Sequence, residues 1–414
     1  FGVPGSRATP ISADARQLNP KTILLTGATG FLGAYLLRDL LRETEAAVVC
    51  LVRARDAADG LVRIKNNMAA YALWHDSFTG RIEALAGDLA RPSLGLSDDQ
   101  FDELAQSVDA IYHNGALVNF LYSYREHKAA NVLGTREILR LAALSQTRRA
   151  VPAPVHFVST LSIFHDGGMA SYRTNNGAMF KENTELDALD LPFGGYAQSK
   201  WVGEKLVMTA MARGIPATIF RPGLISGDSA SGAFPTVPDM MSTMAIACAM
   251  SGSAPDLDVE VDIVPVDFVS KAIVTLAARP ESWGQAFHIS NPRPASYSDM
   301  LKWLAELGLP LQVFSFDQWR AKMVGLAMAA GGENWNPFLP ILEEATADQV
   351  FMPAIDCQNT LVGLAAIADD NGGDPLTCPE VDSRLLATYL NNFQRRGLLA
   401  GSQTVSDPKS TFQS

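Results

Sequence analysis

The stretch KTILLTGATGFLG, residues 21–33, decides the fold class of this chain. It begins as an apolar, leucine-rich run, which is typical of a strand buried on both faces. The glycines that follow permit a tight turn and a close approach of the backbone to a diphosphate. Residues 31–43 continue with apolar side chains at helical spacing, and the start of a helix offers free N–H donors to phosphate. A tight turn without a ligand is the alternative, but we predict a dinucleotide site formed by Thr26, Gly27, Thr29, Gly30, Phe31, Leu32 and Gly33.

Outward from this stretch, strand-like and helix-like segments alternate. The strands are expected at residues 46–53, 81–87, 108–115, from 155 onward and 216–223, and the helices at residues 57–71, 123–144 and 196–211. Such alternation requires a parallel sheet that is covered by helices on both faces. The predicted fold class is therefore α/β, a Rossmann-type doubly wound parallel sheet.

A change of composition after residue 223 predicts a second, smaller domain. The length of 414 residues also exceeds the ~250–300 residues at which single cores stop growing. We assign residues 21–223 and about 261–290 to an NADP-binding Rossmann domain. Residues 224–260 and 291–414 are assigned to a mainly helical domain that faces the substrate. Residues 1–20 are interpreted as a linker or lead-in.

Composition and charge narrow the function classes. A net charge of −11 argues against nucleic acid as a partner. No run of about 18 apolar residues occurs, so no membrane partner is expected, and the first 20 residues lack the pattern of a secretory signal. The four cysteines are far apart and form no CxxC pair, which favours reduced thiols and a cytoplasmic location.

The second strand predicts which dinucleotide is bound. It ends in Arg53, with Arg63 one short helix further on, and no Asp or Glu occupies the strand end. Guanidinium groups match the oxygens of a 2′-phosphate, so we expect NADPH rather than NADH, with ordinary surface arginines as the alternative. At the ends of the next two strands, adenine and the diphosphate-ribose are expected to meet Asp88, Leu89, Asn114, Gly115 and Ala116.

The segment YAQSK, residues 196–200, carries the candidate chemistry. Tyr196 and Lys200 are four residues apart and share one helix face. Both are also expected to contact the cofactor, Lys200 at the nicotinamide ribose. A neighbouring ammonium group favours the phenolate and is expected to lower the pKa of Tyr196, which makes this side chain a usable acid and base. Thr160 is placed to share the substrate carbonyl oxygen, with Ser159 and Ser162 as competitors. Taken alone, YxxxK fits an ordinary surface helix equally well.

These motifs occur in an order that resembles a known family. TGATGFLG, the strand-end arginine, GDL, HNGALVNFLYSYREHKAANVLGT, FVST, YAQSKWVGE and RPGLISG are similar to extended short-chain dehydrogenase/reductases. More closely, residues 21–290 resemble the thioester reductase domains of nonribosomal peptide and polyketide synthetases and of carboxylic acid reductases. The resemblance implies a catalytic set of Thr160, Tyr196 and Lys200, and cofactor positions at Gly27, Gly30, Gly33, Arg53, Arg63, Asp88 and Leu89, with Pro222 and Gly223 near the nicotinamide.

The resemblance also implies a reaction. An acyl or peptidyl thioester on the phosphopantetheine arm of a carrier domain is reduced by NADPH and released as an aldehyde. Whether a second hydride then gives a primary alcohol stays open. The expected partner is the carrier domain, and an excised domain of this kind is expected to be a monomer.

Rival interpretations remain at this point. A stand-alone extended reductase or epimerase would act on a free small molecule or a sugar nucleotide. A nucleotide-binding regulator would usually lack the Tyr/Lys pair, and a hydrolytic release domain would need a GxSxG motif, which is absent.

Several further side chains are expected to have ordinary structural roles. The histidines show no metal-ligand spacing, so we predict no metal site. The methionines at 240, 241, 244 and 250 are expected to pack a core, with a channel for an acyl chain as the alternative. Arg136, Arg140, Arg148 and Arg149 are interpreted as a solvated helix face, and otherwise as a docking site for an acidic carrier.

Overall fold

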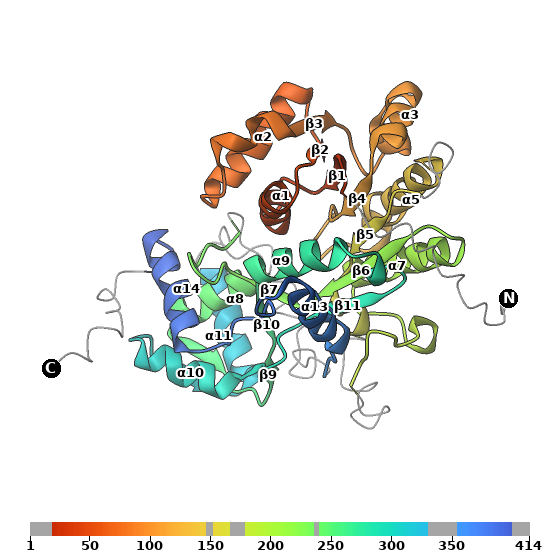
Figure 1. Cartoon of the computed structure of the whole chain (residues 1–414). Helices are drawn as coiled ribbons and strands as arrows, with labels where there is room; N and C mark the ends of the chain where they lie inside the picture. The colour runs from red at the N-terminus through yellow and green to blue at the C-terminus, as the bar shows by residue number, and fades with distance from the viewer. Residues whose placement is uncertain (1–18, 146–151, 166–178, 236–239, 330–353, 400–414) are drawn as a thin grey trace.

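Seven parallel strands form the central sheet of the protein (Figure 1). The computed structural model describes residues 19–145, 152–165, 179–235, 240–329 and 354–399. The strands are β1 (Thr22–Thr26), β2 (Ala47–Val52), β3 (Ile82–Ala86), β4 (Ala110–His113), β5 (Val155–Val158), β6 (Ala217–Pro222) and β11 (Ala286–Ile289). Their order across the sheet is β11-β6-β5-β4-β1-β2-β3. The predicted fold class, a doubly wound parallel sheet, is confirmed.

Helices cover both faces of this sheet, as a sheet of buried parallel strands requires. One face packs against α1 (Phe31–Glu43), α2 (Ala57–Ala70) and α9 (Val266–Ala277). The other face packs against α3 (Asp98–Ser107), α5 (Gly134–Ser145) and α7 (Gly195–Ala212). In β1, Ile23, Leu24 and Leu25 have no exposed surface, because both sides of the strand are covered.

The strand order reverses at β1. The chain leaves β1 through α1 toward β2 and β3, and later returns to pair β4 with the other edge of β1. Thr26 is therefore in register with Leu51 on one side and with His113 on the other. In open α/β sheets, ligands bind in the crevice outside the strand ends at such a reversal. The glycine-rich turn begins at this position.

Two predicted elements differ from the structure. The expected helix over residues 123–144 is interrupted: α4 (Tyr124–His127) is followed by a π-helical segment (Lys128–Leu133) and then by α5. In that segment the side chain of Asn131 hydrogen-bonds to Leu117 and Ser199, contacts that the helical period of the sequence does not reveal. The strand expected from residue 155 ends already at Val158, and a 3₁₀ turn (Leu161–Phe164) replaces its second half.

The region predicted as a second domain contains two further cores. In one, α10 (Tyr297–Glu306) and α14 (Ser383–Arg395) pack with the pair β9 (Glu260–Val261) and β12 (Ala295–Ser296). The other core is centred on Trp319 of α11 (Phe316–Ala329). It packs with α8 (Met240–Ser251) and with the strand pair β8 (Ser253–Pro255) and β13 (Gln312–Phe314). A third short pair joins β7 (Leu224–Ser226) to β10 (Ile263–Pro265).

One helix of the region assigned to the smaller domain packs on the Rossmann sheet instead. Helix α13 (Gln358–Asn371) lies against α9 and the edge strand β11, and Leu364 belongs to the core of the sheet. The segment 354–371 therefore covers the Rossmann sheet, although the sequence assigned it to the smaller domain. The remaining domain division stays a prediction, and residues 1–18 of the expected lead-in lie outside the described ranges.

A buried ion pair and a neighbouring histidine connect helix α7 to strands β6 and β11. Arg221 of β6 donates from Nε and Nη2 to the carboxylate of Glu204 on α7, at 3.0 and 2.5 Å, and both side chains are almost fully buried. Nη1 of Arg221 also donates to Nε2 of His288 on β11, at 2.9 Å. Burial and this guanidinium lower the pKa of His288 to about 3, so the ring accepts the bond as a neutral imidazole.

We expect Arg221→Met to destabilise the fold strongly. The carboxylate of Glu204 would stay buried without its partner, and such a loss costs about 3–5 kcal/mol. Urea denaturation measures the free energy of unfolding. The matched control is Arg293→Met, which breaks an exposed 2.7 Å pair with Glu380 and should stay within about 1 kcal/mol of wild type. Equal losses in the two variants would contradict this account, and Arg221→Met with Glu204→Leu should recover part of the loss.

Candidate active site

The turn between β1 and α1 brings two glycines into contact. Gly27 has φ +78°, a left-handed conformation that side chains rarely adopt, and its carbonyl accepts a bond from the N–H of Gly30 at 3.0 Å. A Cβ on Gly33 would lie 1.9 Å from that same carbonyl oxygen. The turn can therefore close onto α1 only with glycine at position 33.

The same turn presents backbone donors outward. Helix α1 begins at Phe31 directly after Gly30, and no side chain caps its first N–H groups. Asn67 lies on α2, and its Nδ2 donates to the carbonyls of Ala28 and Gly30 at 3.2 and 3.1 Å. These two bonds attach the turn to α2. Anions bind well at such a helix start, so the turn has the donors that a diphosphate needs. Thr29 is half-buried beside them, and Leu32, the second residue of α1, is buried.

The end of β4 lies directly against this turn. The N–H of Gly115 donates to Oγ1 of Thr26 at 2.8 Å, and Asn114 and Ala116 flank it. The side chain of Leu89 packs directly against Gly115, because a Cβ on Gly115 would lie 2.7 Å from Cδ1 of Leu89. Asp88 closes its own loop by accepting the N–H of Ala90 at 2.9 Å. The structure therefore brings these predicted cofactor residues together at one edge of the sheet.

The two predicted phosphate-binding arginines lie together at the end of β2. Arg53 follows the strand directly, and Nη1 of Arg63 on α2 donates to the backbone carbonyl of Arg53. Both residues are exposed. The neighbouring Arg55 is engaged differently, because its guanidinium lies 3.5 Å from Asp59. Arg53 and Arg63 are therefore neighbours at this strand end, whereas Arg55, which is also exposed, pairs with Asp59.

Lys200 joins helix α7 to the end of β5. Its Nζ donates to the carbonyl of Val158 at 2.6 Å and lies 4.2 Å from the centre of the Phe157 ring. Thr160 follows Val158 by two residues, so the bond holds the start of α7 beside the segment that carries Thr160. Tyr196 is one turn earlier on α7, and its ring meets Phe120 edge-on with the centroids 5.6 Å apart.

The protonation of this pair differs from the expectation. Burial raises the pKa of Tyr196 to about 12, and burial lowers the pKa of Lys200 to about 7 against the opposing effect of Glu204. The predicted lowering of the tyrosine pKa is therefore wrong for this structure, because the ammonium contacts a carbonyl and both groups are desolvated. A neutral phenol is nevertheless the form that can donate a proton to a developing oxyanion.

The three candidate hydroxyl groups differ in exposure. Oγ1 of Thr160 accepts the N–H of Ser162 and also donates to Oγ of Ser162, both at 3.1 Å, and the two residues are half-buried. Ser159 is 3% exposed, so its hydroxyl is turned into the interior. Accessibility favours Thr160 and Ser162 over Ser159 as partners of a substrate carbonyl.

The remaining predicted cofactor residues follow Arg221. Pro222 ends β6, and Gly223 lies between β6 and β7 with its N–H donating to the carbonyl of Ile289 at 2.9 Å. A Cβ on Gly223 would lie 3.3 Å from Oδ2 of Asp262 and 3.4 Å from Leu161, the residue after Thr160. Gly223 is therefore close to the segment that carries the candidate hydroxyl groups.

Behind the site lies a chain of polar side chains that the sequence pattern did not predict. Thr26 Oγ1 lies 2.8 Å from Nδ1 of His113, whose Nε2 lies 3.0 Å from Oγ1 of Thr135. Thr135 donates to the carbonyl of Asn131, and Asn131 donates to Ser199 at 2.9 Å. The signal available in the sequence was the polar residues at the ends of apolar strands and inside otherwise apolar helices. Burial lowers the pKa of His113 to about 3, which agrees with its structural role.

Other expectations concern groups away from this edge. Arg136 and Arg140 both pair with Glu137, at 3.0 and 2.9 Å, and Arg148 and Arg149 lie outside the described residues. Met250 is 65% exposed rather than part of a core, and the side chains of the other three methionines lie outside the described part.

All four cysteines are free thiols. Cys50, Cys357 and Cys378 are buried, and Cys248 is half-buried. Within the described ranges, no three His, Cys, Asp or Glu side chains gather as a metal site. The helices in those ranges include none that is long and apolar enough to cross a membrane.

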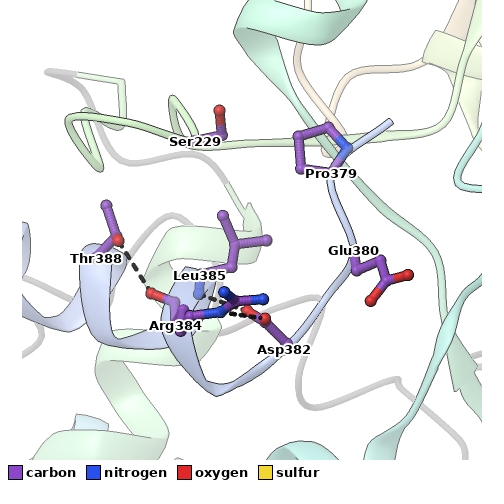
Figure 2. Close-up of a pocket in the computed structure, with 7 residues that line it drawn as sticks. All are labelled: Ser229, Pro379, Glu380, Asp382, Arg384, Leu385 and Thr388. Atoms are coloured by element: carbon purple, nitrogen blue, oxygen red, sulfur yellow. Dashed lines mark hydrogen bonds and ion pairs between the residues drawn. The ribbon is translucent and has the colours of Figure 1, made fainter. Parts of the chain in front are cut away.

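A pocket of about 330 Å³ lies elsewhere, between the loop after β7 and the start of α14 (Figure 2). Ser229 and Pro379 lie at the top of the view in Figure 2, with Leu385 and Arg384 below them. Asp382 accepts bonds from Nε of Arg384 and from the N–H of Leu385, both at 2.9 Å, so these polar groups already have partners. None of the predicted site residues lines this pocket.

The chain is similar to proteins of known families. Residues 25–273 match the NAD-binding family described as male sterility protein. A linear gramicidin synthase protein from Brevibacillus parabrevis is 39% identical over 96% of this chain, and glycine betaine reductase ATRR from Emericella nidulans is 38% identical over 92%. The chain spans only 7% and 29% of the length of these two relatives.

One solved structure matches the chain over most of the length of both proteins. The terminal R domain from the myxalamid PKS-NRPS biosynthetic pathway is 42% identical, covers 93% of both chains and superposes with a TM-score of 0.84.

We expect Gly33→Ala to abolish tight dinucleotide binding. The added methyl group would push α1 away from the Gly27 carbonyl, so the helix start could no longer meet the diphosphate. Titration of NADPH followed by nicotinamide fluorescence measures the effect, and a loss of at least about tenfold corresponds to one lost charge-assisted contact. Gly80→Ala is the control, because no atom lies within 4 Å of its added Cβ. Unchanged affinity in Gly33→Ala would refute this role of the turn.

Proposed function

The chain belongs to the NAD-binding family described as male sterility protein, and we propose that it is a terminal reductase domain that releases the product of a peptide or polyketide synthetase. The resemblance seen in the sequence is thereby confirmed at the level of the family. The chain is an oxidoreductase of the short-chain dehydrogenase/reductase type with a nucleotide site. Its substrate, its preferred dinucleotide and its carrier are parts of the proposal.

One observation carries the proposal furthest: the 2.6 Å bond from Lys200 to the carbonyl of Val158. It holds the Tyr196 helix beside the Thr160 segment at the end of β5. The glycine turn opens at the same edge of the sheet, two strands away, next to Asn114 and Gly115. A proton donor and a dinucleotide turn at one sheet edge are what a carbonyl reductase needs.

The residues present fit a nicotinamide dinucleotide. In the proposal, the glycine turn and the start of α1 hold the diphosphate, and Arg53 and Arg63 hold a 2′-phosphate. Asp88 and Leu89 line the adenine side, while Lys200, Pro222 and Gly223 lie toward the nicotinamide end. When bound, the reduced nicotinamide supplies a hydride.

The proposed reaction starts from an acyl or peptidyl thioester. Hydride addition to the carbonyl carbon converts the carbonyl oxygen into an oxyanion, which Tyr196 and Thr160 stabilise by hydrogen bonds. The phenol of Tyr196 then donates its proton to this oxygen, which gives a hemithioacetal. Collapse of the hemithioacetal breaks the C–S bond, so that the thiol leaves and an aldehyde is released. Reduction of the aldehyde to a primary alcohol would use the same groups once more.

A phosphopantetheine-bearing carrier domain is the proposed partner. The thiolation-reductase di-domain of an archaeal nonribosomal peptide synthetase shares the fold at 23% identity and a TM-score of 0.73. On this chain, Arg136 and Arg140 are less suited to an acidic carrier than the sequence alone indicated, because Glu137 already neutralises part of their charge.

We expect Tyr196→Phe to lose at least about a hundredfold in turnover, the contribution typical of a general acid. S-acyl pantetheine and NADPH are the substrates, and mass spectrometry identifies the aldehyde or alcohol. Affinity for NADPH should be unchanged, since the ring remains. Tyr297→Phe, which alters a phenol at the start of α10, should keep wild-type rates. Wild-type turnover by Tyr196→Phe would refute the assignment, and turnover of sugar nucleotides in place of thioesters would favour the stand-alone epimerase.

We expect Arg53→Ala and Arg63→Ala each to weaken NADPH binding about tenfold, the loss typical of a hydrogen bond to a charged group. Binding of NADH should change little, because it lacks the 2′-phosphate. Fluorescence titration with both dinucleotides gives the ratio of affinities. Arg55→Ala is the matched control, because its guanidinium pairs with Asp59. If both arginine variants bind NADPH and NADH with unchanged ratios, the preference has another origin.

A further inference from the structure

Residues 118–122 form an exposed apolar loop directly after the glycine-containing end of β4. Val118, Phe120, Leu121 and Tyr122 are 57, 44, 45 and 41% exposed, and none of residues 117–122 carries a charge. Single exposed apolar residues need no explanation, but a contiguous group of large ones marks an interaction site. We call these four residues the apolar loop.

The apolar loop adjoins the candidate proton donor. The ring of Phe120 meets the ring of Tyr196 edge-on, with 5.6 Å between centroids and 69° between planes. The base of the loop packs on the start of α7, since a Cβ on Gly195 would lie 2.4 Å from the carbonyl oxygen of Tyr122. A molecule that contacts the phenol of Tyr196 therefore has the apolar loop beside it.

Hydrogen bonds within the chain hold the loop in place. The side chain of Asn131 accepts the N–H of Leu117 at 2.7 Å and donates to the carbonyl of Leu117 at 2.9 Å. At the far end, the N–H of Ser123 donates to Glu126 at 2.7 Å. The exposed side chains are thus presented by an anchored segment, which reduces the entropy lost when a ligand covers them.

The side chains of the apolar loop suit one part of a carrier-bound thioester better than the others. The backbone N–H of Leu121 in the loop, and those of Leu117 and Ser123 at its two ends, already donate within the chain. The amides of a pantetheine arm need hydrogen-bond partners, and an acidic carrier needs cations, whereas the exposed side chains offer apolar surface. An alkyl chain needs only such surface.

We infer that the apolar loop binds the acyl chain of the substrate, so that the chain accepted is a hydrocarbon of several carbons or an apolar peptidyl end group. This inference rests on the proposed function, because it takes the thioester carbonyl to lie at Tyr196. With the thioester carbonyl at the phenol of Tyr196, the acyl chain extends over Phe120 toward Val118 and Leu121.

Acyl-pantetheines of two, four and eight carbons test the inference with the full chain and NADPH. We expect kcat/KM to rise with chain length by up to about fourfold for each methylene group that the loop removes from water. Leu121→Ser and Val118→Ser should flatten this rise. They are preferred to a change at Phe120, whose ring contacts Tyr196. Val362→Ser on α13 is the matched control, because Val362 is 56% exposed and Val118 is 57% exposed.

A binding measurement separates this inference from the proposed function. Amide analogues of the same pantetheines cannot release a thiol, and calorimetry gives their affinities with NADP⁺ present. Affinity that rises with chain length in wild type, but not in Leu121→Ser, supports the inference even if no thioester is reduced. Reduction with equal kcat/KM and equal affinity at all lengths would overturn it and leave the proposed function standing. A concentration-dependent dimer that Leu121→Ser dissociates, with no chain-length effect, would assign the loop to a second copy and also overturn it.

Discussion

The bond from Lys200 to the carbonyl of Val158 is the contact on which the candidate site depends. An ammonium group inside a protein is costly unless it is bound, and this one donates at 2.6 Å and lies over the Phe157 ring. One turn later on α7, Glu204 pairs with Arg221 of β6, which in turn meets His288 of β11. Helix α7 is thus joined to three neighbouring strands by charged or polar groups, and Tyr196 takes its position from that attachment.

A second polar chain relates the nucleotide side of the sheet to the same helix. It runs from Thr26 through His113 and Thr135 to Asn131, and from there to Ser199. Asn131 also clamps Leu117, the residue that leads into the apolar loop. Buried polar groups with all partners present rigidify a structure and favour one arrangement. The glycine turn, Tyr196 and the apolar loop are therefore held in one arrangement by Asn131 and its partners.

The sequence pattern predicted secondary structure correctly where interactions within a short segment decide it. The helix expected at residues 31–43 has those bounds in the structure, because its apolar spacing and the glycines before it leave one choice. The pattern was less reliable over residues 123–144, where Asn131 turns its side chain to Leu117 and Ser199 and the helix widens into a π segment. It also assigned residues 358–371 to the smaller domain, whereas their apolar face packs on α9 and β11.

The sequence by itself determined the parallel sheet, the glycine turn and the placement of Tyr196 and Lys200 on one helix, because glycine placement, strand composition and helical spacing are properties of short segments. Only the tertiary structure decided the protonation of that pair, since burial raises the pKa of Tyr196 and lowers that of Lys200, whereas proximity along one helix predicted the opposite for the phenol. It also decided that Phe120 lies against Tyr196, and that Arg136 and Arg140 share Glu137. Desolvation and contacts between distant segments exist only once the chain has folded.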